Sequence, residues 1–598
     1  MSAVRPSLAS RWQSFEAWVG TRTSGVALFV VALAVFALQS VVLPVHPGRD
    51  MGRYVQTFVQ FFYAEPIVPS VINSRGPLAA LGVGVPLELG GGAAEVWLGV
   101  LYAASIVAWG AVALKFGPRA AVLTTGLLLV YPGYGMLFHG LASDALFAAA
   151  FAGWAVLLSR AILRPSVATF LAAGLGMGLL VLVRPPNQVL ILFTLLPILL
   201  RAPWGRRLAW MASFFVASAA VTQGWKALAT LRWGDAVALR PSGAVLVAAF
   251  VLLPFLFPAP WRRRLVLLAI SLVVVAVAVK GPSLQNPVQY ARSVTQSPSS
   301  SVFLFRAFEI DRIVEPDNGP ASRELARVVQ RELLSKEPYR SYGVDLQEFF
   351  SSGSDRIFGD LTSLGGSADL ESVTREAIRR HPETFATGVL RTMWELFRAR
   401  IYAPEGISSA GGESSAKDKT GETDLIVVNG RKLPRPSEGQ PIPASRVGLA
   451  IRTLGGQAQE VWRSPTEHPL IFDDPRDERR YEKFGADTDR LMDRIPTRDA
   501  NSGLVHRLNQ ASRASPPPVF WLAVGLIALG VRRPRQALVA LAPALAGLAV
   551  IVATGVVAFP VPEYAAPVSP AFVMLAAVGL VGAHPRGRLR LPWRERSV

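Results

Sequence analysis

The sequence contains no cysteine, and its few histidines do not show the spacing of metal ligands. The missing cysteines exclude a disulfide framework, a thiolate metal site and a cysteine nucleophile. The six histidines stand at positions 46, 139, 381, 468, 506 and 584. We therefore expect neither a bound metal ion nor another cofactor.

Charged residues are also scarce. They make up 17% of the chain, against about 25% of an ordinary soluble domain. Hydrophobic residues reach 51%, and stretches such as Gly25–Val45 are apolar over about the length that crosses a ~30 Å hydrocarbon layer as a helix. No segment shows the ~10-residue alternation of an outer-membrane barrel. The sequence therefore predicts an all-α, polytopic membrane protein and excludes soluble, fibrous and disordered classes.

The apolar stretches predict about twelve transmembrane helices. They lie near residues 25–45, 93–114, 119–138, 144–163, 166–183, 188–201, 208–228, 242–259, 265–280, 517–531, 536–556 and 565–583. The first follows three arginines and is long for a signal peptide, so we interpret it as an uncleaved signal anchor.

The net charge of +19 belongs to the membrane part of the chain. Residues 281–516 hold 32 basic and 33 acidic side chains, and the remainder holds 29 and 9. If the N-terminus is cytoplasmic, the cytoplasmic ends of the spans collect 21 cations and two anions, as the positive-inside rule requires. We expect a multi-pass protein of the plasma (cell inner) membrane with both termini in the cytoplasm. The polar region has no basic stripe interleaved with aromatic residues, so nucleic acid is not an expected partner.

The predicted spans and the distribution of charge divide the chain into three sections. They are an N-terminal block of about nine spans (1–280), an extracytoplasmic and mainly helical region (281–516), and three closing spans with a basic tail (517–598).

Within the extracytoplasmic region, residues 321–336 and 369–381 have the pattern of amphipathic helices. Residues 383–401 predict a helix that either lies on the membrane surface or packs on the helical cap. Residues 404–443 are rich in Gly, Ser, Pro and Lys, which predicts a mobile loop.

The first outer loop, residues 46–92, contains two further apolar segments. Residues 51–62 place their apolar side chains at helical spacing, but they are too short and too charged to span a membrane. We expect a helix parallel to the membrane surface there. Residues 73–92 are apolar but contain Gly76, Pro77 and Pro86, which predicts a short interfacial or re-entrant helix.

Charged residues cluster at those span ends that the topology places outside. The acids are Asp50, Asp144 and Glu563, with Tyr564 beside the last, and the cations include Arg49, Arg53, Arg184 and Lys226. A carboxylate can take a proton from an acceptor hydroxyl, and arginines can hold a phosphate in bidentate fashion. Structural roles are the alternative, because boundary cations often reach toward lipid headgroups and Asp144 could cap its helix.

Five short motifs carry a resemblance to a known family. They are HPGRDMGRY with Asp50, LASDALF with Asp144, AAGLGMGLLVLVRPP with Arg184, PEYAAPVSPAFVMLAA with Glu563 and Tyr564, and IRRHPETF. Together they resemble the GT-C superfamily of integral-membrane glycosyltransferases, above all the bacterial protein-mannosyltransferase and lipid A aminoarabinose-transferase branch. The chain departs from that branch at Met51, where a second acid is common, and in placing its large polar region before the last three spans.

The resemblance implies a GT-C-like bundle and inverting transfer of a sugar from a polyprenyl-phosphate donor to the hydroxyl of a glycan, lipid or protein outside the cytoplasm. Asp50 would be the catalytic base. Arg184, with Arg53 or Lys226, would bind the donor phosphate. Asp144, Glu563, Tyr564 and Arg49 would position the substrates.

Two other functions stay open from the residues themselves. A transporter or flippase of lipid-linked sugars would favour charges near the middle of spans and paired broken helices. A non-enzymatic scaffold would use residues 281–516 to bind a partner. Clustered acids and arginines at the outer ends of the spans favour the enzyme.

Overall fold

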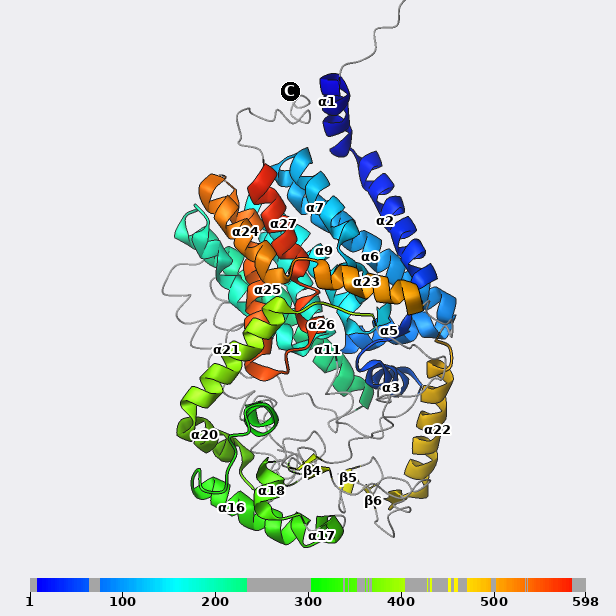
Figure 1. Ribbon diagram of the computed structural model, residues 1–598, viewed down its shortest axis with the longest axis vertical. Helices are drawn as coiled ribbons and strands as arrows, with labels where there is room; N and C mark the ends of the chain where they lie inside the picture. Colours follow the sequence, from blue (N-terminus) through cyan, green and yellow to red (C-terminus); the bar gives the residue numbers. More distant parts are fainter. Residues whose placement is uncertain are drawn as a thin grey trace, which may run out of the picture.

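The computed structural model describes residues 8–63, 76–233 and, with gaps of which the longest are 404–426 and 433–449, 303–582 (Figure 1). Five described helices are long and apolar enough to cross a membrane, at Arg22–Val42, Gly91–Phe116, Ser143–Leu163, Ser502–Arg532 and Ala537–Val557. Five shorter apolar helices accompany them. The prediction of a polytopic helical membrane protein is confirmed.

The N-terminal part of the bundle is built from helices that follow one another through short connections, except that the first outer loop separates the second helix from the third. These are α1 (Leu8–Val19), α2 (Arg22–Val42), α6 (Gly91–Ala113), α7 (Pro118–Val130), α8 (Pro132–Leu137), α9 (Ser143–Leu163), α10 (Val167–Val183), the 3₁₀ helix η2 (Pro185–Leu199) and α11 (Trp204–Trp233). The connection between α9 and α10 is short, so the start of α9 and the end of α10 lie at the same end of the bundle.

The C-terminal helices complete this bundle. They are α23 (Ser502–Ala514), α24 (Pro518–Arg532), α25 (Ala537–Val557), α26 (Pro562–Ala565) and α27 (Ser569–Val581). Helix α27 is apolar on all sides, and every residue from Ser569 to Gly579 is buried, as expected for a helix at the centre of a bundle. It packs against α24, α25 and α7.

The first outer loop lies against the end of the bundle. Helix α3 (Met51–Phe62) buries one face, including Tyr54, Val55 and Phe58, against α5 (Pro77–Leu89). Gly84 of α5 permits this approach, because a Cβ atom there would lie 2.1 Å from Cγ of Phe58. Both helices agree with the two short helices expected in this loop.

The polar region forms a second layer with a small core of its own (Figure 1). Its helices are the π-helical turns η4 (Arg306–Ile310) and η5 (Gln330–Leu334), and the α-helices α16 (Pro320–Val329), α17 (Tyr339–Tyr342), α18 (Leu346–Ser351), α20 (Leu370–Arg380), α21 (Pro382–Arg398) and α22 (Pro475–Met492). The strands are β3 (Val427–Val428), β4 (Arg431–Lys432), β5 (Ala450–Arg452), β6 (Gln457–Glu460) and β7 (Leu470–Phe472). β3–β4 and β5–β6–β7 pair in antiparallel order.

Two long helices connect this layer to the bundle. Helix α21 packs against α25, where Gly555 leaves room for Met393, and α22 packs against α3 and α5. The helix expected at residues 383–401 therefore packs on a span as well as joining the cap. Helix α1 and the end of α27 lie at the opposite end of the bundle from α16 and α17 (Figure 1).

The structure does not settle the count of twelve spans. The expected spans at 242–259 and 265–280 lie outside the described residues, as does the loop expected at 404–443 apart from β3 and β4. Residues 185–199 form a 3₁₀ helix that contains Pro185, Pro186 and Pro197, where the sequence suggested an ordinary span. Prolines lack the N–H that an α-helix needs, which accounts for the irregular geometry. The three-section division stays a prediction.

Candidate functional site

A short backbone bridge joins the first outer loop to the start of α9. His46–Pro47 (β1) pairs in parallel with Gly140–Leu141 (β2). The His46 amide donates to the carbonyl of His139 at 2.9 Å, and the Gly48 amide donates to that of Leu141 at 3.3 Å. A Cβ atom on Gly48 would lie 2.6 Å from Cβ of Ala142, so only glycine fits this approach. The bridge brings the HPGRD motif beside the motif that contains Asp144.

Asp144 and Arg184 form an ion pair at this end of the bundle. Asp144 lies in the first turn of α9, and Arg184 directly follows the last residue of α10. The N-terminal end of one helix and the C-terminal end of the next therefore place the two side chains together. The side chains are 7% and 14% exposed. Ser143 Oγ accepts hydrogen bonds from Arg184 Nε at 3.0 Å and from the Tyr54 hydroxyl at 2.8 Å. The acid therefore holds a guanidinium group in place and does not cap α9 through a side-chain hydrogen bond.

Tyr564 lies beside two guanidinium groups. Its ring centroid is 5.5 Å from Cζ of Arg184 and 5.8 Å from Cζ of Arg49, within the range of cation–π attraction. Its neighbour Glu563 is also on α26, and both Arg49 and Glu563 are close enough to interact with the charge of Asp144. Three distant stretches of sequence thus meet around Asp144.

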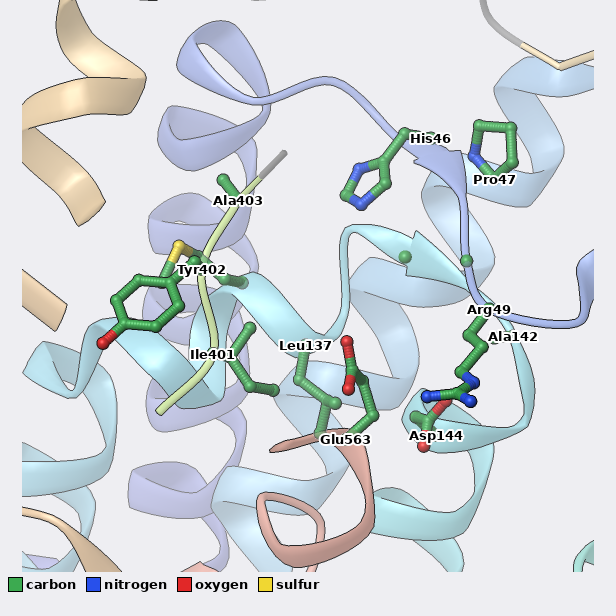
Figure 2. A pocket seen from close by; sticks show the side chains of 13 residues that line it. His46, Pro47, Arg49, Leu137, Ala142, Asp144, Ile401, Tyr402, Ala403 and Glu563 are labelled. Atoms are coloured by element: carbon green, nitrogen blue, oxygen red, sulfur yellow. The ribbon is translucent and has the colours of Figure 1, made fainter. Parts of the chain in front are cut away.

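A cavity of about 230 Å³ lies beside Asp144 (Figure 2). Arg49, Asp144 and Glu563 supply its charged wall. His46, Pro47 and Gly48 of the bridge, with Met136, Leu137, Gly140 and Ala142, supply a second wall. Ile401, Tyr402 and Ala403, which follow α21, close a third side. Glu563 Oε2 is buried and has no hydrogen-bond partner among the described residues.

The histidines of the bridge are electrically neutral at physiological pH. Desolvation by the surrounding protein lowers the pKa of His46 to about 4. Burial and the nearby His46 lower the pKa of His139 to about 3. The His139 ring stacks on Phe36 with centroids 4.5 Å apart and is fully buried. The cations at this cavity are therefore arginines.

The structure brings five of the candidate residues together: Arg49, Asp144, Arg184, Glu563 and Tyr564. The other candidates are Asp50, Arg53 and Lys226. Asp50 directly precedes α3 with a left-handed backbone conformation (φ 60°), and it is not among the residues that line the cavity. Arg53 lies exposed one turn further along α3. Lys226 belongs to α11, and its side chain lies outside the described part of the chain.

Sequence analysis missed His46 and the segment 401–403. A proline and a glycine follow His46, which marks a tight backbone approach, but no local pattern shows which strand it meets. Ile401, Tyr402 and Ala403 come after a helix, and their sequence contains no motif that marks them as part of a site. Hydrogen bonds from distant residues fix the segment at the cavity. Asn509 binds both backbone groups of Ala403, at 2.8 and 3.0 Å, and Ser512 Oγ donates to the carbonyl oxygen of Ile401 at 2.6 Å.

No group of three or more His, Asp or Glu side chains that could hold a metal ion occurs among the described residues. What the arrangement offers is guanidinium groups, carboxylates and a neutral imidazole. Guanidinium groups bind phosphate, and carboxylates accept protons or hydrogen bonds from hydroxyl groups.

No protein-family model and no curated protein matches the chain. Two solved structures are similar to it, both of ArnT from Cupriavidus metallidurans. The one bound to undecaprenyl phosphate is 18% identical and covers 64% of this chain and 83% of its own, with a TM-score of 0.28. The apo structure is 17% identical and covers 63% and 80%, with the same TM-score. Backbones that superimpose so incompletely carry no argument about this chain's reaction, and the fold class rests on the helices themselves.

Proposed function

We propose that this protein is a membrane glycosyltransferase that moves a sugar from a polyprenyl-phosphate donor to an acceptor hydroxyl outside the cytoplasm, with inversion at the sugar. The observation that carries the proposal is the cavity at the end of the bundle, where Arg49, Asp144 and Glu563 share one wall. A lipid-linked phosphate can reach such a place from the bilayer while its isoprenoid tail stays between the helices.

The donor phosphate would bind to the arginines. Arg49 lines the cavity directly. Arg184 lies behind Asp144, and its Nε and Nη2 atoms donate hydrogen bonds to Ser143 and Asp144. A polyprenyl phosphate leaves as an anion, so guanidinium groups beside it stabilise the charge that develops during transfer. Arg53 and Lys226 remain proposed donor ligands from the sequence, and Tyr564 would keep Arg49 and Arg184 at a fixed separation.

Asp50 is the proposed base on the family resemblance, and Glu563 is a second candidate on the geometry. A base must reach the acceptor hydroxyl within hydrogen-bond distance. Glu563 faces the cavity with a buried, unpartnered oxygen, whereas Asp50 lies one residue beyond the cavity-lining Arg49. The carboxylate of Asp144 is neutralised by Arg184, so its proposed role is to position substrate and arginine.

The acceptor would approach from the polar region. Residues 401–403 belong to that region and line the cavity. We therefore propose that residues 281–516 shape the acceptor side, and that this end of the bundle faces away from the cytoplasm, with both termini on the cytoplasmic side of the inner membrane.

A transferase assay tests the proposal. Purified protein in lipid nanodiscs is supplied with radiolabelled polyprenyl-phosphate sugars and an envelope glycan or lipid fraction, and transfer of label is measured. Loss of the base lowers the rate by about 100- to 10,000-fold. Asp50→Asn and Glu563→Gln identify which carboxylate acts, since only the base shows such a loss in kcat. Lys115→Gln replaces an exposed cation to which no role in transfer is assigned, and it is the control for nonspecific damage. Wild-type protein that transfers no label from any donor contradicts the proposal.

A further inference from the structure

The ring of His46 enters the cavity from β1 and faces Glu563 across it (Figure 2). This imidazole has no part in the proposed binding of the donor phosphate or in the proposed proton transfer. Its two nitrogens have different surroundings, and those surroundings determine what the ring can bind.

The hydrogen bonding of His46 fixes its tautomer. Nδ1 lies 3.3 Å from the carbonyl oxygen of Pro44. A carbonyl oxygen can only accept, so Nδ1 carries the proton and donates it. A neutral imidazole has one proton, which leaves Nε2 with a free lone pair. Nε2 has no hydrogen-bond partner among the described residues, and it points to the cavity side of the ring (Figure 2).

The low pKa of His46 agrees with this assignment. A ring whose pKa is lowered to about 4 by desolvation stays neutral at the pH of a cell envelope, so Nε2 remains an acceptor there. The charged and titratable groups around it are Arg49 on the same segment, His139 beside the bridge, Asp144 on α9, Glu563 on α26 and Tyr402 after α21.

The cavity therefore presents two unpartnered acceptors, Nε2 of His46 and Oε2 of Glu563. A buried acceptor without a partner, as Oε2 of Glu563 is, costs free energy unless a ligand supplies a donor. Neighbouring hydroxyl groups on a carbohydrate ring can donate to both acceptors, and their oxygens can accept from Arg49.

We infer that Nε2 of His46 accepts a hydrogen bond from a ring hydroxyl of the carbohydrate in this cavity, so that His46 is a positioning residue that selects the sugar. This rests on the proposed function. The hydroxyl belongs either to the transferred sugar or to the acceptor glycan.

Steady-state kinetics with matched variants test the inference. His46→Gln can place its amide oxygen near the position of Nε2, whereas His46→Asn ends near Nδ1 and His46→Phe has no acceptor. We expect His46→Phe and His46→Asn to raise one KM about three- to tenfold, the range of one neutral hydrogen bond, with kcat nearly unchanged. His46→Gln restores the KM to within about twofold of wild type, a rescue that a purely structural role would not give.

The KM that changes identifies the source of the hydroxyl. A change in the KM for undecaprenyl-phosphate sugar assigns it to the donor, and a change for the acceptor fraction assigns it to the acceptor. In the first case, a series of deoxy-sugar donors identifies the hydroxyl. The analogue that lacks this hydroxyl has a higher KM than the complete donor in wild type, but the same KM as the complete donor in His46→Phe. Unchanged KM values for both substrates in His46→Phe, in a protein whose wild type is active, overturn the inference alone.

A second measurement does not depend on activity. Nitrogen NMR of ¹⁵N-histidine-labelled protein, with the His46 signal assigned by its loss in His46→Gln, reports which ring nitrogen is protonated. The expected result is a protonated Nδ1 and an unprotonated Nε2. A proton on Nε2 overturns the inference whatever the kinetics show. Absence of transfer by wild-type protein contradicts the proposed function, and the spectrum still tests the tautomer.

Discussion

Two regions of the molecule each contain a buried arginine–aspartate pair, and their surroundings differ. Arg184 and Asp144 lie at the end of the bundle beside a cavity. Arg306 and Asp311 lie where the polar region meets the bundle, with side chains 0% and 2% exposed. The chemistry of the two pairs is the same, so their surroundings must account for any difference in role.

The second pair is sealed. Nε and Nη2 of Arg306 donate to the two carboxylate oxygens of Asp311, and Nη1 donates to the carbonyl oxygen of Gly555 on α25. Thr392 of α21 accepts another hydrogen bond at 3.4 Å. Each guanidinium nitrogen has a partner within the protein, and the pair joins η4 to two helices.

The first pair leaves hydrogen-bonding capacity unused nearby. The unpartnered oxygen of Glu563 and the lone pair of His46 face the same cavity as Asp144. Burial of ions is costly unless partners compensate for the lost hydration. Where hydrogen-bond partners fully replace the lost hydration, the ion pair stabilises the fold. Where acceptors nearby keep no partner, the site is suited to bind a ligand.

The largest expected effect concerns the sealed pair. Arg306→Met leaves Asp311 buried without its counter-ion, so we expect a loss of about 3–5 kcal/mol of stability. Thermal unfolding of the detergent-solubilised protein measures this loss, with the fraction of protein that remains monodisperse after heating as the readout. The double variant Arg306→Met with Asp311→Leu removes the uncompensated charge and recovers most of the loss. Equal stability of wild type and Arg306→Met would show that the pair does not connect the two layers.

The open pair should affect activity more than stability. Asp144→Asn keeps the shape of the side chain but releases the guanidinium of Arg184, and misplacement of such a group by about 1 Å costs on the order of 100-fold in rate. Sugar transfer in nanodiscs measures it. Ser143→Ala removes the hydroxyl that accepts hydrogen bonds from Arg184 and Tyr54 but keeps the ion pair, so it is the matched comparison and should cost less than Asp144→Asn. A stability loss as large as that of Arg306→Met would remove the distinction between the two pairs.

Gly48→Ala tests whether the bridge positions the open site. The added methyl group would overlap with Cβ of Ala142 and push β1 away from β2, at a cost of about 1–3 kcal/mol. We expect reduced transfer together with a lower unfolding temperature. Gly126→Ala, on α7 with no atom within 4 Å of the added carbon, should be neutral or slightly stabilising. Full activity of Gly48→Ala would show that the bridge is dispensable.

The smallest effect is expected where α22 meets α5. Arg494 and Arg490 lie 3.5 and 3.7 Å from Glu88, but the exposed fractions of the three side chains are 33%, 43% and 34%. Solvent screens such pairs, so Glu88→Gln should cost no more than about 1 kcal/mol, and less at high salt. Unfolding temperatures of wild type and variant at low and high salt provide the measurement. A cost that does not change with salt would assign the contact to packing.

Much of the bundle could be predicted from the sequence because its cause is local. Runs of apolar residues at Gly25–Val45 and 144–163 are long enough to form spans whatever surrounds them, and α2 and α9 lie there. The spacing of Met51, Tyr54, Val55 and Phe58 likewise predicted α3, because the apolar face of an amphipathic helix is set by its own sequence.

The candidate site could be predicted only in part. Span parity placed Asp144 and Arg184 at the same end of the bundle, since two consecutive antiparallel helices must bring the start of one near the end of the next. Parity does not say which side chains touch. The contribution of His46 and of residues 401–403 depends on a parallel bridge and on Asn509, both of which join parts of the chain that are far apart in sequence.

The sequence by itself determined that this chain crosses a membrane in helices and that its acids and arginines gather at one end of them, because hydrocarbon length and the cost of unpaired backbone groups act on each segment separately. The tertiary structure alone decided that one arginine–aspartate pair is sealed and the other lies at a cavity. That difference depends on which carbonyl, hydroxyl and imidazole groups from distant segments complete each shell of hydrogen bonds.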